Sequence, residues 1–137
     1  MAKNRYDRKS KQLEDKSPKR EPYIVFSFRD FDRNQGQGFT EWQEDAILAV
    51  LCERLTGISH LTVGEVINQQ IIKRYTKVDF PTESVFKHPK HVPDNVIWAS
   101  MHIQGKECII GHFEENVFNI VFLDKNHEFW ITKKKNT

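Results

Sequence analysis

The chain has 137 residues, the size of one domain, because a second hydrophobic core would not fit in this length. Hydrophobic residues make up 38% and charged residues 29% of it, and no apolar run approaches the roughly 18 residues that would cross a bilayer. The first residues are polar and do not resemble a secretory signal. The composition therefore predicts a cytoplasmic globular protein without membrane contact.

The net charge of +2 is unevenly distributed along the chain. Residues 1–20 contain eight Lys/Arg and three Asp/Glu, and residues 133–135 are all lysine, whereas residues 21–132 contain ten Lys/Arg and 16 Asp/Glu, a net charge of −6. We therefore expect a single mildly acidic domain over 21–132, with disordered basic tails at 1–20 and 133–137. Such tails either attract polyphosphate non-specifically or only increase solubility.

The first predicted element is a strand over residues 23–29, directly after Pro22. Three apolar side chains alternate there with other residues and would share one face: Ile24, Phe26 and Phe28. The glycine-bearing stretch 34–38 lacks the Lys-Ser/Thr of a P-loop and the third glycine of a dinucleotide-binding loop, so it is predicted to be a plain connection.

Two helices are predicted next. Thr40 and Gln43 have the spacing of a capping box, and apolar residues recur at helical intervals until Gly57, which predicts one long buried helix. Thr62 and Glu65 repeat the capping-box spacing and predict a second, shorter helix.

The remainder predicts an antiparallel meander. Residues 71–78 form a first candidate strand, and the three prolines within 79–95 predict a long irregular loop. Turn-forming triplets of hairpin length then separate three apolar runs, at 96–103, 107–113 and 117–123. The predicted fold class is α+β, with an N-terminal strand, two helices and a three- to four-stranded antiparallel meander.

One register of this meander places eight apolar side chains on the face packed against the helices: Ile97, Ala99, Met101, Cys108, Ile110, Phe118, Ile120 and Phe122. The opposite face then carries Trp98, Ser100, His102, Glu107, Gly111 and Asn119. His102 and Glu107 would form a cross-strand pair in this register. A slip of one residue in either hairpin would exchange the two faces.

The two cysteines and one pair of histidines are candidate metal ligands. Cys52 and Cys108 lie in segments predicted to be a buried helix and a buried strand, and neither has a second cysteine in CxxC spacing, which excludes a zinc ribbon. His88 and His91 have a spacing that a metal site uses, but no third ligand is evident and Pro89 fits a turn. We therefore expect no metal and no cofactor.

Histidine is the residue type that suggests catalysis. Four of the six histidines, His88, His91, His102 and His127, are predicted near one sheet face and the loop before it, and imidazole exchanges protons near neutral pH. His127 follows the turn-type triplet 124–126 at the end of the last strand. It either reaches a ligand at the sheet edge or only pins the turn.

Aromatic and basic residues of the same region are candidates for binding nucleic acid: Trp98, His88, Lys90, His91, Lys125 and Trp130. The alternative for the two tryptophans is that they belong to the core. The chain contains no nucleophile elbow, Walker motif, His-Glu-x-x-His motif or kinase signature, so the common motif-bearing enzyme classes are disfavoured.

The closing stretch from Gly111 to His127 resembles the ending of small prokaryotic proteins, mostly of unassigned function, with the pattern Gly-Phe-x-x-Asn-Val-Phe-x-Ile-Val-Trp-Leu-Asp-x-x-His. The order of strand, helices and meander is more distantly similar to that of the RelE/ParE toxin superfamily. The resemblance implies a toxin-antitoxin or phage-defence protein acting on RNA or the ribosome, a metal-independent endoribonuclease held silent by a cognate antitoxin. It implies His127 as the catalytic candidate that matches a family position, with His102 and Lys106 as looser candidates. Glu107, the predicted cross-strand partner of His102, is the fourth catalytic candidate.

Two other functions remain open. The acidic charge of residues 21–132 favours a non-catalytic interaction module, an antitoxin-like or inhibitor subunit that binds a basic partner. The basic ends at 3–20 and 133–135 favour a small accessory protein that holds nucleic-acid phosphates, with an affinity that falls steeply with salt.

Overall fold

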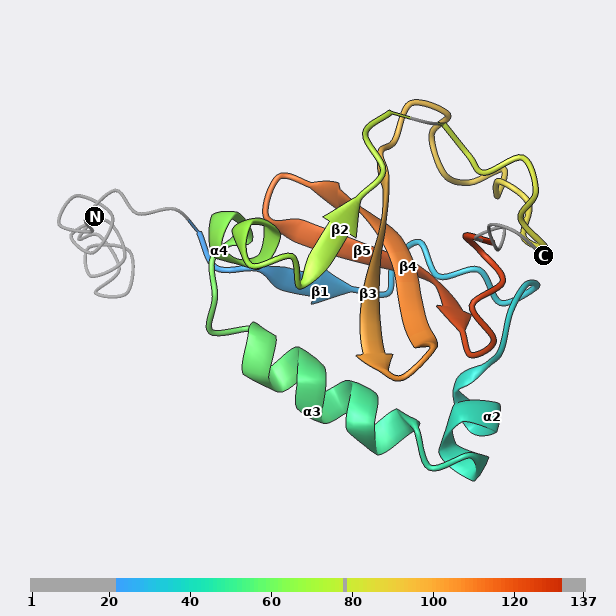
Figure 1. Ribbon diagram of the computed structural model, residues 1–137, viewed down its shortest axis with the longest axis horizontal. Helices are drawn as coiled ribbons and strands as arrows, with labels where there is room; N and C mark the ends of the chain where they lie inside the picture. The colour runs from blue at the N-terminus through green and yellow to red at the C-terminus, as the bar shows by residue number, and fades with distance from the viewer. Residues whose placement is uncertain (1–21, 78, 132–137) are drawn as a thin grey trace, which may run out of the picture.

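The computed structural model describes residues 22–77 and 79–131, and the predicted basic tails at 1–20 and 133–137 lie outside them. Within the described part, one strand, three helices and four further strands follow one another (Figure 1): β1 (Val25–Ser27), α2 (Phe39–Glu44), α3 (Leu48–Ile58), α4 (Val63–Asn68), β2 (Ile72–Arg74), β3 (Trp98–Gln104), β4 (Glu107–Glu114) and β5 (Val117–Asp124). The predicted α+β class is confirmed. No described helix is long and apolar enough to span a membrane.

The five strands form one sheet in the order β1-β5-β4-β3-β2. Strands β2 to β5 pair antiparallel with their sequence neighbours, which is the predicted meander, and β1 adds to its far edge by pairing parallel with β5. Both edge strands have only three residues and are shorter than the predicted runs 23–29 and 71–78. The chain leaves β1 early because it turns after Phe28, whose carbonyl accepts a hydrogen bond from the Phe31 amide.

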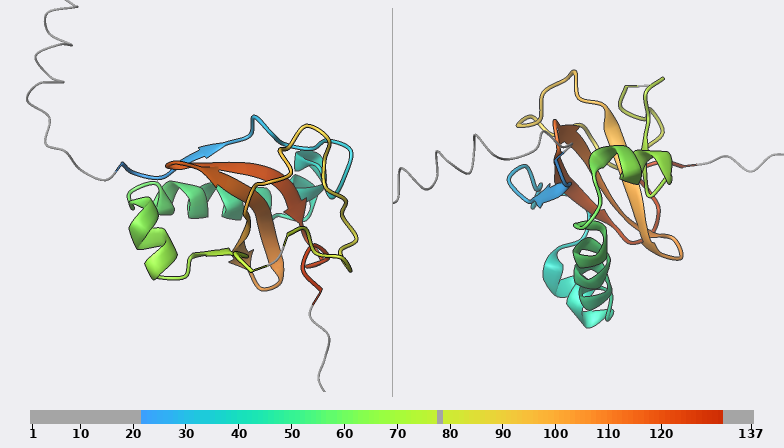
Figure 2. Two further views of the ribbon diagram at one scale, coloured as in Figure 1. Left: turned by 90° about the horizontal axis from the view of Figure 1, so that it is seen from above. Right: turned by 90° about the vertical axis from the view of Figure 1, so that its left-hand side faces the viewer.

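The helices cover one face of the sheet, which we call the helix side. Figure 1 shows α3 running along this side, and Figure 2 shows the same layering from two further directions. Leu51 and Ile58 of α3 and Val66 of α4 are buried together with sheet residues of three strands: Ala99, Met101, Ile103, Ile109, Phe118, Ile120 and Leu123. Burying a side chain of this kind contributes about 1.5–3 kcal/mol, so this cluster is a principal source of stability.

The opposite face, the loop side, is also buried over much of its area. The proline-containing loop between β2 and β3 and the segment after β5 lie over it (Figure 1). They contribute Phe86, Val92 and Phe129 to a second cluster with the sheet residues Trp98, Cys108, Ile110, Val121 and Phe122. The predicted polar face is therefore open only where this cover ends.

The β3–β4 register differs by one residue from the predicted register. The turn contains two residues, the first of them Gly105 with a φ of +52°, so that Gln104 pairs with Glu107. A bulge between His102 and Gln104 then shifts the register by one residue, and His102 pairs with Cys108. The predicted His102–Glu107 pair is therefore wrong. Because side chains alternate along a strand, the one-residue difference also exchanges the faces of β4.

Several predicted orientations change with this register. Cys108 and Ile110 belong to the loop-side cluster, whereas Gly111 pairs with a helix-side residue of β3. On β5, a bulge opposite the step between Ile110 and Gly111 turns Phe122 to the loop side. Ile97 precedes β3 and is 46% exposed instead of buried.

The predicted long helix is two helices separated by a sharp turn. Thr40 makes no capping bond, because the N-cap of α2 is Gly38, and Ala46 has a left-handed φ of +61° where the chain turns into α3. Gly57 lies inside α3 and does not end it, and Cys52 is exposed on this helix instead of buried. The second capping box, between Thr62 and Glu65 at the start of α4, is confirmed.

Candidate acid-base site

The site begins with four side chains on the loop side of the sheet, two from β3, one from β2 and one from the residue that follows β2. Lys73 is the cross-strand partner of Ser100, and the amide of Tyr75 donates to the Trp98 carbonyl, which extends the pairing by one step. Because every second residue of a strand points to the same face, Lys73 and Tyr75 lie beside Ser100 and His102.

The corner after β5 brings two further side chains to this face. Asp124 is fully buried, and its two carboxylate oxygens accept hydrogen bonds of 2.8 Å from the amides of Glu128 and Phe129. This bonding fixes the chain direction immediately after the strand. His127, at the tip of the corner, has a left-handed φ of +59°, a conformation that histidine tolerates better than most residues do.

Two ring stacks join the corner to the sheet. The imidazoles of His102 and His127 lie 5.4 Å apart between centroids with an interplanar angle of 27°. The rings of Tyr75 and Trp130 lie 4.6 Å apart and are nearly parallel, at 6°. The stacks place two imidazoles from segments 25 residues apart in the sequence next to each other.

A pocket of about 250 Å³ lies at these stacks, and we call it the histidine pocket. Eight residues line it, four of them the sheet residues named above and two of them from the corner: Gln70, Ile71, Lys73, Tyr75, Ser100, His102, His127 and Trp130. Two imidazoles, two hydroxyls and an amine therefore open into one small volume.

Hydrogen bonds determine the roles of several of these groups. Nδ1 of His102 lies 3.2 Å from the Gly105 carbonyl oxygen, which only accepts, so Nδ1 carries the proton and Nε2 of the neutral ring is left as a proton acceptor. The Tyr75 hydroxyl lies 2.7 Å from Oγ of Ser100. Burial raises the pKa of the Tyr75 phenol, which keeps it protonated and able to donate.

The strand beside the histidine pocket is locally basic although residues 21–132 are acidic overall. Lys73, Arg74 and Lys77 are exposed, and none of them forms an ion pair with a carboxylate of residues 22–77 or 79–131. Among the ten described lysines and arginines, Arg29 and Lys125 alone form such pairs, Lys125 with Asp45 at 2.8 Å. Three of the eight unpaired cations of the described residues therefore lie within five residues at the β2 edge, where they would attract an anion.

The structure brings together only part of the predicted site. His102, His127 and Trp130 line the histidine pocket, whereas Lys106 is exposed in the β3–β4 turn and Glu107 pairs with Gln104. Lys106 and Glu107 do not line the pocket.

The remaining predicted nucleic-acid contacts are placed elsewhere. Trp98 is 1% exposed and is packed between aromatic rings, so neither of its faces is available to a base. Lys125 is held by ion pairs with Glu41 of α2 and with Asp45, the C-cap of that helix. Lys90 is exposed on the β2–β3 loop.

The two loop histidines have structural contacts. Nε2 of His88 lies 2.9 Å from the Val92 carbonyl, and Nε2 of His91 lies 2.7 Å from the Asp30 carbonyl. Each ring nitrogen donates to a main-chain oxygen and so ties the loop to itself or to the segment after β1. Neither histidine lines the histidine pocket.

One group of side chains has the composition of a metal site. Ligand atoms of Asp30, His112 and Glu114 lie within 4.8 Å of one another. The Arg29 guanidinium already bridges the two carboxylates, with contacts of 3.3 Å to Asp30 and 2.7 Å to Glu114, and Nε2 of His112 lies 3.1 Å from Asp30. The Arg29 cation therefore neutralises the negative charge of the two carboxylates, and the group is an ion-pair network that stabilises the fold.

The buried Asp124 carboxylate is expected to contribute strongly to the stability of the corner. Asp124→Asn keeps the size of the side chain but sets an NH₂ group against one of the two amides that now donate to it. We expect a loss of about 2 kcal/mol in the free energy of unfolding, measured by urea denaturation. The control Asp94→Asn, at a fully exposed position, is expected to change stability by less than about 0.5 kcal/mol, and equal effects of the two variants would contradict the assignment.

Sequence reasoning found His102, His127 and Trp130 but missed Lys73, Tyr75 and Ser100 as site residues. The signal was present, because residues 71–78 were predicted to be a strand and would have put Lys73 and Tyr75 on one face. The register between β2 and β3, which places Lys73 and Tyr75 beside Ser100, could not be predicted because a long loop connects the two strands. Comparison of the chain with protein-family models, with curated proteins and with solved structures gives no match.

Proposed function

We propose that this protein is a metal-independent endoribonuclease and that the histidine pocket is its active site. The observation that carries the proposal is the stacked pair of His102 and His127, two imidazoles that open into one pocket beside an unpaired basic strand edge. RNA supplies its own nucleophile, the ribose 2′-hydroxyl, so a base, an acid and a positive charge are the groups that its cleavage requires.

The pocket residues fit these roles. Nε2 of His102 accepts the proton of the 2′-hydroxyl, whose oxygen then attacks the adjacent phosphorus. A protonated His127 gives its proton to the departing 5′-oxygen, and the P–O5′ bond breaks. The products are a 2′,3′-cyclic phosphate and a 5′-hydroxyl. Water then takes the proton from His102 and returns one to His127.

Other groups of the pocket support the charge that develops on the phosphate. Lys73 supplies a positive charge, and the Tyr75–Ser100 hydroxyl pair supplies a donor, since Tyr75 stays protonated. The exposed cations Arg74 and Lys77 extend the positive edge along which a flexible single strand would lie. This local charge lets an acidic domain hold an anionic substrate.

The proposal is tested by incubating the purified full-length chain with single-stranded RNA, both free and bound to ribosomes, in the presence of EDTA. We expect cleavage that the chelator does not abolish, with 2′,3′-cyclic phosphate and 5′-hydroxyl ends detected by end-specific labelling. Expression in growing cells is expected to arrest growth. If neither RNA preparation is cut and growth continues, the proposal is wrong.

A cognate antitoxin partner remains part of this proposal, since a ribonuclease of this kind must be restrained in the cell that makes it. The net charge of −6 over residues 21–132 favours a second candidate, a non-catalytic module that binds a basic protein. Recovery of one stoichiometric protein partner, together with absent cleavage by the free chain, would support the second candidate over the first.

A further inference from the structure

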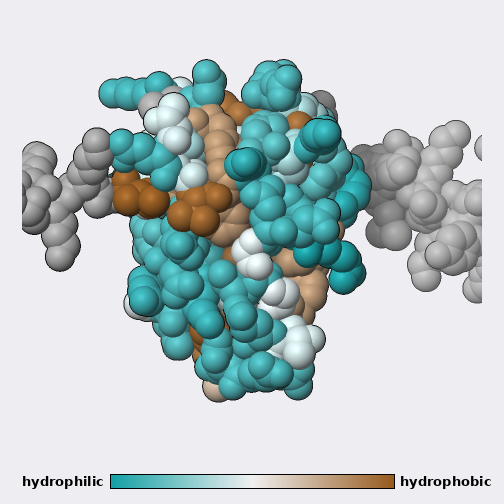
Figure 3. Space-filling model, turned by 90° about the vertical axis from the view of Figure 1, so that its right-hand side faces the viewer, coloured by the Kyte–Doolittle hydropathy of each residue, from teal (hydrophilic) through white to brown (hydrophobic). Residues whose placement is uncertain are grey.

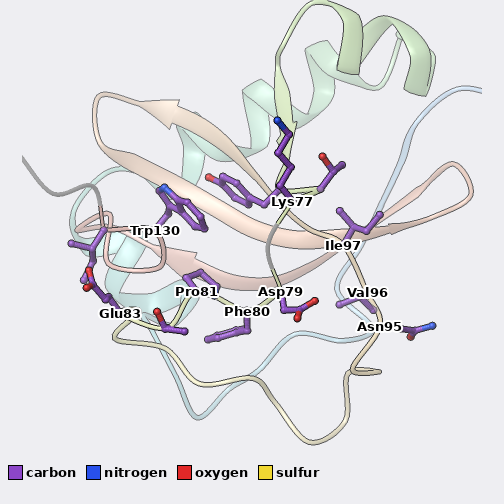
Figure 4. A pocket seen from close by; sticks show the side chains of 13 residues that line it. Lys77, Asp79, Phe80, Pro81, Glu83, Asn95, Val96, Ile97 and Trp130 are labelled. Carbon is purple, nitrogen blue, oxygen red and sulfur yellow. The ribbon is translucent and has the colours of Figure 1, made fainter.

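A larger pocket of about 570 Å³ adjoins the histidine pocket, and we call it the base pocket. Figure 4 shows Trp130, Pro81 and Phe80 on one side of it and Asn95, Val96 and Ile97 on the other. Its volume is in the range of small-molecule sites. The β2–β3 loop and residues 130 and 131 after β5 together form its walls.

The two pockets share the stacked pair of Tyr75 and Trp130. A ligand in the base pocket is therefore separated from the two histidines only by the rings of Tyr75 and Trp130. A nucleotide could occupy both pockets at once, because its planar base and its sugar-phosphate are covalently joined. Trp130 is partly exposed and offers aromatic surface for stacking, as proteins that hold single-stranded RNA do.

The walls of the base pocket favour a flat apolar group over a phosphate. Ile97 and Ile131 line it and are 46% and 44% exposed. Large apolar side chains with this exposure are few in the described chain, and on the side seen in Figure 3 hydrophobic side chains form a small group within a mostly hydrophilic surface. Asp79 and Glu83 line the base pocket together with one cation, Lys77, so its charged side chains do not favour a phosphate.

Asp79 indicates which base the pocket would prefer. Its carboxylate accepts hydrogen bonds and donates none, and it makes no hydrogen bond or ion pair with another described residue. Figure 4 shows it between Phe80 and Val96. Asn95 also lines the pocket, and its amide both donates and accepts. Guanine is the base that presents two adjacent donors, its N1–H and its 2-amino group, beside an acceptor.

We propose that the base pocket binds guanine on the 5′ side of the cleaved bond, with Asp79 accepting from the N1–H and 2-amino groups and Trp130 stacking on the ring. The inference rests on the proposed ribonuclease function for the position of the scissile phosphate. Guanine binding itself does not require cleavage. The protein would then cut RNA after guanosine.

Binding is measured with the four nucleoside 3′-monophosphates by tryptophan fluorescence of the full-length protein. Trp42 and Trp98 are at most 1% exposed, so quenching reports on Trp130. We expect guanosine 3′-monophosphate to bind at least about tenfold more tightly than the other three, because charge-assisted hydrogen bonds are lost with them. Asp79→Asn is expected to weaken guanosine 3′-monophosphate binding about tenfold. The matched control Glu53→Gln, an exposed acid on α3, is expected to leave it unchanged.

The two proposals fail in different ways. Equal affinity for the four nucleotides, or an unchanged affinity in Asp79→Asn, overturns the guanine pocket even if RNA is cut. Guanine-selective binding that Asp79→Asn abolishes supports the pocket even if RNA is not cut, and the absence of cleavage then overturns the ribonuclease. Mapping of the cut positions in a mixed-sequence RNA tests both proposals together. We expect cleavage after guanosine by the wild type and after all four bases by Asp79→Asn.

Discussion

Replacement of either stacked histidine is expected to lower the rate of RNA cleavage by about 10²- to 10⁴-fold, the range for loss of a positioned acid or base. Suitable variants are His102→Gln and His127→Asn, because asparagine tolerates the left-handed φ of +59° at position 127. Rates are measured under single-turnover conditions with an RNA that contains one cleavable site. The double variant is expected to be little slower than either single variant, because groups that act together are not additive.

The control for the histidine variants is His60→Asn, which removes an exposed imidazole that has no described partner and lies outside the histidine pocket. It is expected to cleave at the wild-type rate. The wild type should show a bell-shaped dependence of the rate on pH, since one ring must be neutral and the other protonated, and each single variant should lose one limb of the bell. Full activity of His102→Gln or of His127→Asn would contradict the assignment of the two roles.

The meander was predictable from sequence because its signals are local. Each apolar run of β3, β4 and β5 ends at a turn-forming group, and the antiparallel pairing of sequence neighbours follows from the short connections. The faces were not predictable with the same certainty. A bulge in β3 between His102 and Gln104 and a bulge in β5 each move side chains to the other face, and neither bulge has a distinctive sequence.

The candidate site was predictable only in the part that lies on regular elements near a distinctive corner. His127 stands after a turn triplet, and His102 alternates with apolar residues along β3, so both were identified from the sequence. Tyr75 joins the site through pairing across a loop of more than 20 residues, which no local pattern reports. Trp98 is of a residue type that stacks on bases, but the loop that covers it makes it inaccessible to solvent.

Gly111 lies beside the bulge between β4 and β5 and has no room for a side chain. A Cβ built on Gly111 would lie 2.0 Å from the Asn119 carbonyl oxygen and 2.9 Å from its carbonyl carbon. Real Cβ atoms do not approach backbone atoms so closely, and a carbonyl inside a paired strand cannot move without breaking the ladder of β4 and β5. Gly111 therefore permits the close approach of the two central strands.

Gly111→Ala is accordingly expected to lower the free energy of unfolding by more than about 3 kcal/mol, at or above the upper end of the range for overpacked cores. The measurement is urea denaturation followed by circular dichroism, with the midpoint compared at constant slope. Gly57→Ala is the matched control, because a Cβ on Gly57 meets no atom within 4 Å and the residue lies inside α3. Since alanine favours the helix over glycine, the control should gain up to about 1 kcal/mol. Opposite signs for one added methyl group would show that the approach of β4 and β5, and not a general intolerance of larger residues, sets the requirement for glycine at position 111.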